Sequence, residues 1–202
     1  MLKDDEQILV VKSDILFKDG VWQGLKTENL DYYVDLIKNN CEFKRRGDME
    51  TDNSYQQIIP YMIFSDPAAK KFFAYRYINN AGETRLINNN YQLGVGGHIN
   101  KEDRIEDKNV LEQGMMREWE EEVNFEGGIL QKKLVGIIND DTNPVEEVHV
   151  GLVYHFMGDN ENIQIKETDK MAGQMFFVEE ILKLPHSPWM NIVYKEYLSK
   201  LI

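Results

Sequence analysis

A glycine run followed by an acidic helix-forming segment is the feature that most constrains how this chain can fold. The run is Gly-Val-Gly-Gly-His at 94–98, and residues 110–123 have the periodicity of an α-helix. One face of that helix would carry three carboxylates at the spacing i, i+3 and i+4, beside an apolar face. The carboxylates are those of Glu118, Glu121 and Glu122, and the apolar residues are Met115, Met116, Trp119 and Val123. The sequence therefore predicts a helix that packs through one face and presents concentrated negative charge on another.

Three carboxylates on one helical face repel one another unless water or a cation neutralises them. Oxygen ligands suit Mg²⁺ or Mn²⁺, which bind through carboxylates, water and substrate phosphates. Gly94, Gly96 and Gly97 permit a tight turn and a close approach of the backbone to a ligand. Gly114 lies within the carboxylate face, where its missing side chain leaves room for another group. A solvated acidic face is the alternative interpretation, and the glycine run upstream favours a metal site.

The same residues resemble the signature of the Nudix hydrolases, G-x5-E-x7-R-E-U-x-E-E-x-G-U, where U is a bulky apolar residue. Gly97 matches the first glycine, Arg117 and Glu118 match the R-E pair, and Glu121 and Glu122 match the E-E pair. The bulky apolar positions are Trp119 and Phe125. This resemblance implies an α/β (α+β) fold, a Nudix-like α/β/α sandwich with a mixed β-sheet.

The match to the signature has two departures. Nineteen residues separate Gly97 from Arg117, where the signature has thirteen, so six residues are extra. The first motif glutamate becomes Asp103 when counted forward and Asn109 when counted back, with Glu106 and Asp107 between them. The glycine after the E-E pair is Asn124, which is the next-best residue for a left-handed helix cap. The metal-binding part of the motif is intact, and its supporting acid is left unassigned.

The resemblance implies hydrolysis at phosphorus with Mg²⁺ (or Mn²⁺) as cofactor. The implied metal ligands are the Gly97 carbonyl and the side chains of Glu118, Glu121 and Glu122. A bound metal would orient a diphosphate and activate water. By resemblance either Glu121 or Glu118 is the general base, and the sequence leaves both open. Arg117 is interpreted as orienting a glutamate, with Glu121 at i, i+4 as one ion-pair partner.

Three further residues are candidates for substrate contact. Arg76 ends a predicted strand at 71–77, a place where the resembling family often has an arginine near the site. His98 follows Gly97 directly, although a lone histidine is more often a packing residue. Glu147 lies in the acidic loop 139–147, at the stage of the chain where family members often supply another carboxylate. Weaker candidates are Asp141 and Glu146 in that loop and Arg45 and Arg46 upstream.

Composition limits the partners of this chain of 202 residues. Its formal net charge of −12 disfavours binding to duplex nucleic acid, which requires lysine and arginine to neutralise phosphates. A phosphorylated small molecule is still allowed, because a metal ion can invert the local field. The single cysteine, Cys41, fits a reducing compartment. With no signal peptide and no apolar run long enough for a bilayer, we expect a cytoplasmic protein without a membrane partner.

The chain divides into an N-terminal extension at 1–54, packed on the core, and a Nudix-like catalytic domain at 55–202. The extension is predicted to contain a β-hairpin, with strands at 8–11 and 14–17 and a turn at 18–20, then a helix. That helix runs from a cap at Thr27 to Asn40, and 43–53 is predicted to be a loop. Strands are predicted at 58–64, 71–77, 130–138, 148–157 and 174–178, and a closing helix at 190–201. This additional N-terminal element and the habit of the family favour a homodimer.

The function predicted by the resemblance is metal-dependent cleavage of a diphosphate linkage in a nucleoside diphosphate derivative or a related phosphorylated small molecule. One alternative is a non-catalytic, nucleotide- or ligand-binding regulatory relative that has lost the first motif glutamate. Another is an isoprenoid diphosphate isomerase, which would need a cysteine near the site, whereas Cys41 lies far upstream in sequence. The sequence does not identify the substrate.

Overall fold

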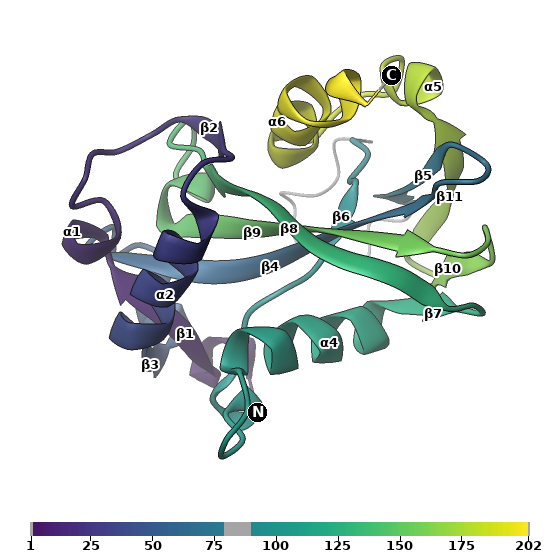
Figure 1. Ribbon diagram of the computed structural model, residues 1–202. Coiled ribbons are helices and arrows are strands. Elements are labelled where there is room, and N and C mark those ends of the chain that lie inside the picture. The colour runs from purple at the N-terminus through teal and green to yellow at the C-terminus, as the bar shows by residue number, and fades with distance from the viewer. Residues whose placement is uncertain (1, 79–89, 202) are drawn as a thin grey trace. The chain divides into compact units, whose positions relative to one another are not determined.

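The computed structural model describes residues 2–78 and 90–201, with helices and strands mixed along the chain (Figure 1). The turn predicted at 79–83 lies outside the described residues. The chain forms two compact units, each built from three stretches of sequence. Unit 1 comprises Met1–Tyr61, Gly96–Glu118 and Gly136–Val153, and unit 2 comprises Met62–Val95, Trp119–Val135 and Tyr154–Ile202.

Unit 1 is built around β1 (Gln7–Lys12), whose residues Ile8 to Val11 are fully buried. β1 pairs antiparallel with β3 (Glu42–Arg45) along one edge and with β4 (Tyr55–Asp66) along the other. A strand that is flanked on both edges and covered on both faces is expected to be continuously apolar, as these residues are.

A second strand pair of unit 1 joins β2 (Gly24–Lys26) to β8 (Ile129–Asn139), with Leu25 opposite Ile138.

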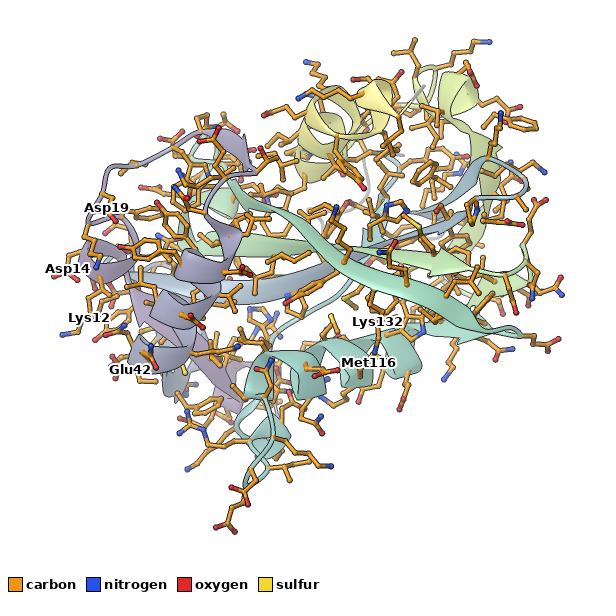
Figure 2. All side chains as sticks on the ribbon, in the orientation of Figure 1. Lys12, Asp14, Asp19, Glu42, Met116 and Lys132 are labelled. Carbon is orange, nitrogen blue, oxygen red and sulfur yellow. The ribbon has the colours of Figure 1, made fainter. Side chains whose placement is uncertain are left out.

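The predicted N-terminal hairpin is wrong. Residues 14–17, expected as a strand, fall largely in α1 (Ser13–Leu16), and β2 pairs with β8 instead. The edges of β1 are taken, because Val10 is paired with both Glu42 and Gln57, so no edge remains for a hairpin partner. Figure 2 labels three exposed residues of this region: Lys12 at the end of β1, Asp14 within α1, and Asp19 beyond it.

The helices of unit 1 partly match the prediction. α2 (Leu30–Asn40) ends where expected but follows Asn29 rather than Thr27. The prediction of a loop at 43–53 is wrong. That stretch contains most of β3, which pairs with β1, and then α3 (Arg46–Met49). α4 (Val110–Glu122) confirms the predicted acidic helix, and its residues up to Glu118 belong to unit 1. The short 3-10 helices here are η1 (Lys3–Asp5), η3 (Lys101–Asp103) and η4 (Glu146–Val148).

Unit 2 contains an antiparallel strand order β11-β5-β4, formed by β11 (Met171–Phe177), β5 (Lys71–Tyr77) and the second half of β4. β6 (Gly94–Val95) pairs with β4, and β7 (Val123–Phe125) pairs with β10 (Ile163–Ile165).

Aromatic side chains form the core of unit 2. The Trp119 ring at the end of α4 lies 5.8 Å from Phe64 and 4.9 Å from Phe156 of β9 (His149–Gly158), measured between ring centres. The apolar face predicted for the acidic helix therefore packs as expected.

The C-terminal helix begins earlier and ends earlier than predicted. α6 (Pro188–Glu196) follows α5 (Val178–Ile181) and is succeeded by η5 (Leu198–Lys200). Ser187 caps α6, with its side chain accepting a hydrogen bond from the Met190 amide, and proline at the first helical position is favourable. Among the described residues, no helix is long and apolar enough to cross a membrane.

Candidate active site

The glycine run makes two close contacts within unit 1. A Cβ at Gly96 would lie 1.8 Å from the Pro60 carbonyl oxygen, so the chain can pass β4 only without a side chain there. A Cβ at Gly97 would lie 2.5 Å from Oε2 of Glu118. The structure thus brings together Gly97 and Glu118, two of the predicted metal ligands.

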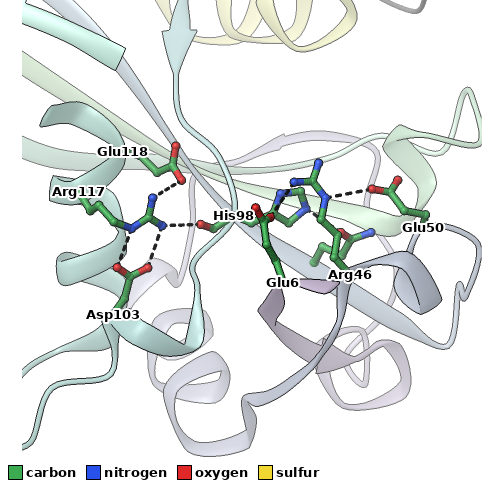
Figure 3. A network of polar contacts seen from close by, with 8 residues as sticks. Glu6, Arg46, Glu50, His98, Asp103, Arg117 and Glu118 are labelled. Atoms are coloured by element: carbon green, nitrogen blue, oxygen red, sulfur yellow. Dashed lines mark hydrogen bonds and ion pairs between the residues drawn. The ribbon is translucent and has the colours of Figure 1, made fainter. Parts of the chain in front are cut away.

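Arg117 joins three groups of unit 1 (Figure 3). Its Nε and Nη2 donate to the two carboxylate oxygens of Asp103 at 2.7 and 2.9 Å. Its Nη1 donates to Glu118 Oε1 at 2.7 Å, and Nη2 also donates to the His98 carbonyl at 2.8 Å. The hydrogen bonds to Asp103, followed by the charge of Glu118, raise the pKa of Arg117 further above its ordinary value. Arg117 is therefore a cation held between the carboxylates of Asp103 and Glu118.

Asp103 is the one of the four candidate supporting residues for which the structure gives an ion pair with Arg117. It ends η3, is buried, and accepts a hydrogen bond from the Asn100 amide at 2.8 Å. The other candidates, Glu106, Asp107 and Asn109, are exposed. Asp103 is also the residue reached by counting forward from Gly97, and residues 104–109 lie between η3 and α4.

The space left by Gly114 is filled by the chain itself. A Cβ at Gly114 would lie 2.8 and 2.9 Å from the branched carbons of Ile99 and 3.1 Å from Asp103 Oδ2. The space beside Gly114, which was predicted to admit another group, is therefore occupied by the Ile99 side chain and the Asp103 carboxylate.

The His98 ring is held by β4 and lies beside a second histidine. Its Nε2 is 2.7 Å from Gln57 Oε1, and its ring centre is 5.5 Å from that of His149. Burial, followed by the positive charge of Arg46, lowers the pKa of His98 well below its ordinary value. The imidazole is consequently neutral at physiological pH.

Arg46 forms a second ion-pair network near His98 (Figure 3). It pairs with Glu6 at 3.0 Å and with Glu50 at 3.3 Å. The neighbouring Arg45 pairs with Asp5 and Asp48. Sequence reasoning missed these pairs, although the i, i+4 spacing of Arg46 and Glu50 would have indicated one of them had a helix been expected there.

The acidic loop of unit 1 distinguishes Glu146 from Glu147. Glu147 is exposed, and its Oε1 accepts a hydrogen bond from Asn53 at 3.4 Å. Burial, together with the nearby charge of Asp140, raises the pKa of Glu146 from 4.5 to about 7. The sequence named Glu146 only as a weaker candidate, because its partial burial cannot be read from a polar loop.

Glu121 and Glu122 lie in the last turn of α4, in unit 2, with Glu121 exposed and Glu122 half-buried. Arg76 also belongs to unit 2, where its guanidinium lies 5.5 Å from the centre of the Tyr91 ring. Within 2–78 and 90–201, no three His, Cys, Asp or Glu side chains form a ready metal cluster. The donors on α4 are nevertheless carboxylate oxygens, which suit Mg²⁺ or Mn²⁺.

Comparison with known proteins identifies the class. The solved structure of Tm1382, provisionally assigned as a Nudix hydrolase, matches with a TM-score of 0.82 and 26% sequence identity, over 98% of this chain and 100% of Tm1382. The mixed α+β fold with a mixed sheet is the Nudix fold, which confirms the predicted fold class. This chain belongs to the Nudix superfamily. It is also 32% identical over 188 residues to protein YmaB of Bacillus subtilis (strain 168), covering 90% of each chain. No protein-family model matches it.

Proposed function

We propose that this protein is a metal-dependent hydrolase that cleaves a diphosphate linkage in a nucleoside diphosphate derivative or a related phosphorylated small molecule. The observation that carries the proposal is the Asp103–Arg117–Glu118 network, with Gly97 packed against the Glu118 carboxylate. A network of this kind fixes the orientation of a carboxylate, which is what a metal ligand requires from its supporting residues.

The residues that would hold Mg²⁺ or Mn²⁺ are Glu118, Glu121 and Glu122 along α4, with the Gly97 carbonyl. When bound, the metal supplies charge neutralisation and a water of lowered pKa. Glu118 is already held by Arg117, and a carboxylate that accepts from a guanidinium is a weaker base. We therefore assign orientation of Glu118 to Arg117, and proton acceptance from the attacking water to Glu121 or Glu118, as the resemblance implies.

Arg76, His98 and Glu147 are proposed as substrate contacts. The hydrogen bond from the Leu9 amide to the Ile99 carbonyl, at 2.8 Å, supports a role for the N-terminal extension (1–54) beside the catalytic domain (55–202), because it ties β1 to the segment that carries His98. We further propose that the protein is cytoplasmic and acts as a homodimer.

The proposal is tested by measuring phosphate and nucleotide release from a panel of nucleoside diphosphate derivatives, with and without Mg²⁺ or Mn²⁺. Glu121→Gln and Glu122→Gln should abolish turnover without unfolding the protein. Glu120→Gln is the matched control, because Glu120 is on the same helix, outside the i, i+3, i+4 face. Wild-type rates in both test variants would contradict the assignment. Binding of metal and nucleotide without turnover would instead favour the regulatory alternative.

A further inference from the structure

We propose that Lys166 is a positioning residue for the metal site, because it caps the last turn of α4 and so fixes the carboxylates of Glu121 and Glu122. This assignment rests on the proposed function, since it presumes that both glutamates bind a divalent metal. It goes beyond that proposal by naming a residue outside the signature, on another segment of unit 2, on which the geometry of the site depends.

The last turn of α4 requires partners from outside the helix. In any α-helix the last four carbonyl groups have no amide of the same helix to accept from. In α4 these are the carbonyls of residues 119–122, the turn that carries two of the three proposed metal ligands. Helix ends fray more readily than helix centres, and repulsion between the carboxylates of Glu118 and Glu122, at i and i+4, adds to that tendency. A metal site on this turn therefore depends on what holds the helix end.

Asn124 does not provide the left-handed cap that its residue type allows. Glycine commonly ends a helix in the left-handed conformation, and the signature has a glycine at this position. Asn124 instead lies in β7, pairs with Gln164 of β10, and does not have a positive φ. The end of α4 is consequently held in another way.

Lys166 donates two hydrogen bonds to carbonyls of this turn. Its main-chain amide donates to the Glu122 carbonyl at 2.9 Å, which continues the antiparallel pairing of β10 with β7 by one residue (Figure 1). Its Nζ donates to the Glu120 carbonyl. A cation at the C-terminal end of a helix also interacts favourably with the helix dipole. Lys166 thus holds the carbonyls on both sides of Glu121.

The segment that carries Lys166 is itself anchored. The preceding residue, Ile165, is buried and lies opposite Val123, the buried residue that follows the helix. On the other side the Thr168 amide donates to the Lys166 carbonyl at 3.0 Å. The acceptor of Nζ is a carbonyl rather than a carboxylate, so this bond fixes the turn without occupying a side-chain oxygen that a metal would need.

The cap is tested in the metal-free protein by hydrogen–deuterium exchange. Lys166→Met keeps the aliphatic chain and the main-chain amide but removes the ammonium, whereas Lys166→Arg retains a cationic donor. Amides of 119–125 should exchange at least about threefold faster in Lys166→Met and at near wild-type rates in Lys166→Arg. Lys170→Met is the matched control, because Lys170 lies four residues further along and pairs with Glu167 at 2.7 Å. Unchanged exchange in Lys166→Met would overturn the proposal.

The effect on the metal site is tested by calorimetric titration of Mn²⁺ into the same four proteins. Lys166→Met should bind Mn²⁺ at least about fivefold more weakly than the wild type, and Lys166→Arg and Lys170→Met should bind within about twofold of it. Removing a positive charge near a cation site strengthens metal binding by Coulomb's law. Weaker binding by Lys166→Met would therefore report a loss of geometry rather than a loss of charge.

The outcomes separate this proposal from the proposed function. Equal Mn²⁺ affinity in the wild type and Lys166→Met would overturn the role of Lys166 and leave the hydrolase intact. Affinity that depends on Lys166, in a protein that hydrolyses no diphosphate, would overturn the hydrolase and support the role of Lys166. No Mn²⁺ binding by the wild type would overturn both. Lys166 is exposed, so its variants should fold, and thermal unfolding of each one checks this.

Discussion

At the scale of single residues, Asp103 is the part of the site that the signature alone could not identify. Asparagine at this position keeps the shape and loses one charged acceptor of the bidentate pair with Arg117. We expect Asp103→Asn to lower kcat about 10- to 100-fold, the usual effect of removing a residue that orients a metal ligand. Steady-state kinetics on the substrate found in the panel measures it.

Two exposed acids are the controls for that variant. Glu106→Gln and Asp107→Asn should leave kcat within about twofold of the wild type, because surface changes without partners have small effects. A similar loss in all three variants would mean that net charge, rather than the Asp103–Arg117 pair, is responsible.

The raised pKa of Glu146 predicts that the stability of the protein depends on pH. Its pKa is about 7 in the folded protein and 4.5 ordinarily, so the folded state binds more protons between those values. Stability should therefore fall as pH rises from 4.5 to 7, by up to about 3 kcal/mol. Glu146→Gln should remove this decline. Urea unfolding of the wild type and of Glu146→Gln, with a chelator present, measures this decline. Parallel pH profiles of the two proteins would contradict the prediction.

At the scale of elements, α4 contains Gly114, which weakens the helix and lies close to Ile99 and Asp103. Alanine at 114 would be favoured by about 1 kcal/mol on helix propensity. We nevertheless expect Gly114→Ala to destabilise the protein and reduce activity, because its Cβ would meet Ile99 at 2.8 Å and Asp103 at 3.1 Å. In the double variant Gly114→Ala/Ile99→Ala, the loss of unfolding free energy should be smaller than the sum of the losses in the two single variants. Additive losses would contradict the steric explanation.

A buried chain of hydrogen bonds in unit 2 joins β4, β9 and the end of α6. His155 contacts Ser65 Oγ at 2.7 Å and the Tyr197 hydroxyl at 2.9 Å, and burial lowers its pKa to about 4. The unfolded chain binds more protons than the folded protein between pH 4 and 6.5. The contribution of neutral His155 to stability is therefore lost as pH falls through that range. Relative to His155→Gln, the wild type should lose up to about 3 kcal/mol by pH 4. If the wild type and His155→Gln differed in unfolding free energy by the same amount at pH 7 and at pH 4, the prediction would be contradicted.

Long periodic elements were predictable from sequence and short ones were not. α4 and β8 match their predicted ranges to within one residue, because their apolar patterns extend over many positions. β2, β3 and β10 have three or four residues each and are defined by partners distant in sequence. The 14–17 segment failed for the same reason, since only the pairing of β1 on both edges decides against a hairpin.

The candidate site shows the same limit. The glutamates of α4 and their arginine were readable from spacing along one helix. Asp103 was one of four candidates, because an insertion hides which acid meets Arg117. The partnership of Gln57 with His98 joins residues 41 positions apart and has no sequence signal.

At the scale of the whole molecule, fold and family support one central claim: the three glutamates of α4 hold a divalent metal that enables hydrolysis. The measurement that tests it most directly needs no substrate. Mn²⁺ is titrated calorimetrically into the wild type, Glu122→Gln and the control Glu120→Gln. We predict saturable binding by the wild type and the control, with an affinity at least about tenfold lower in Glu122→Gln. Equal Mn²⁺ affinity in all three proteins, or no binding by the wild type, would contradict the claim.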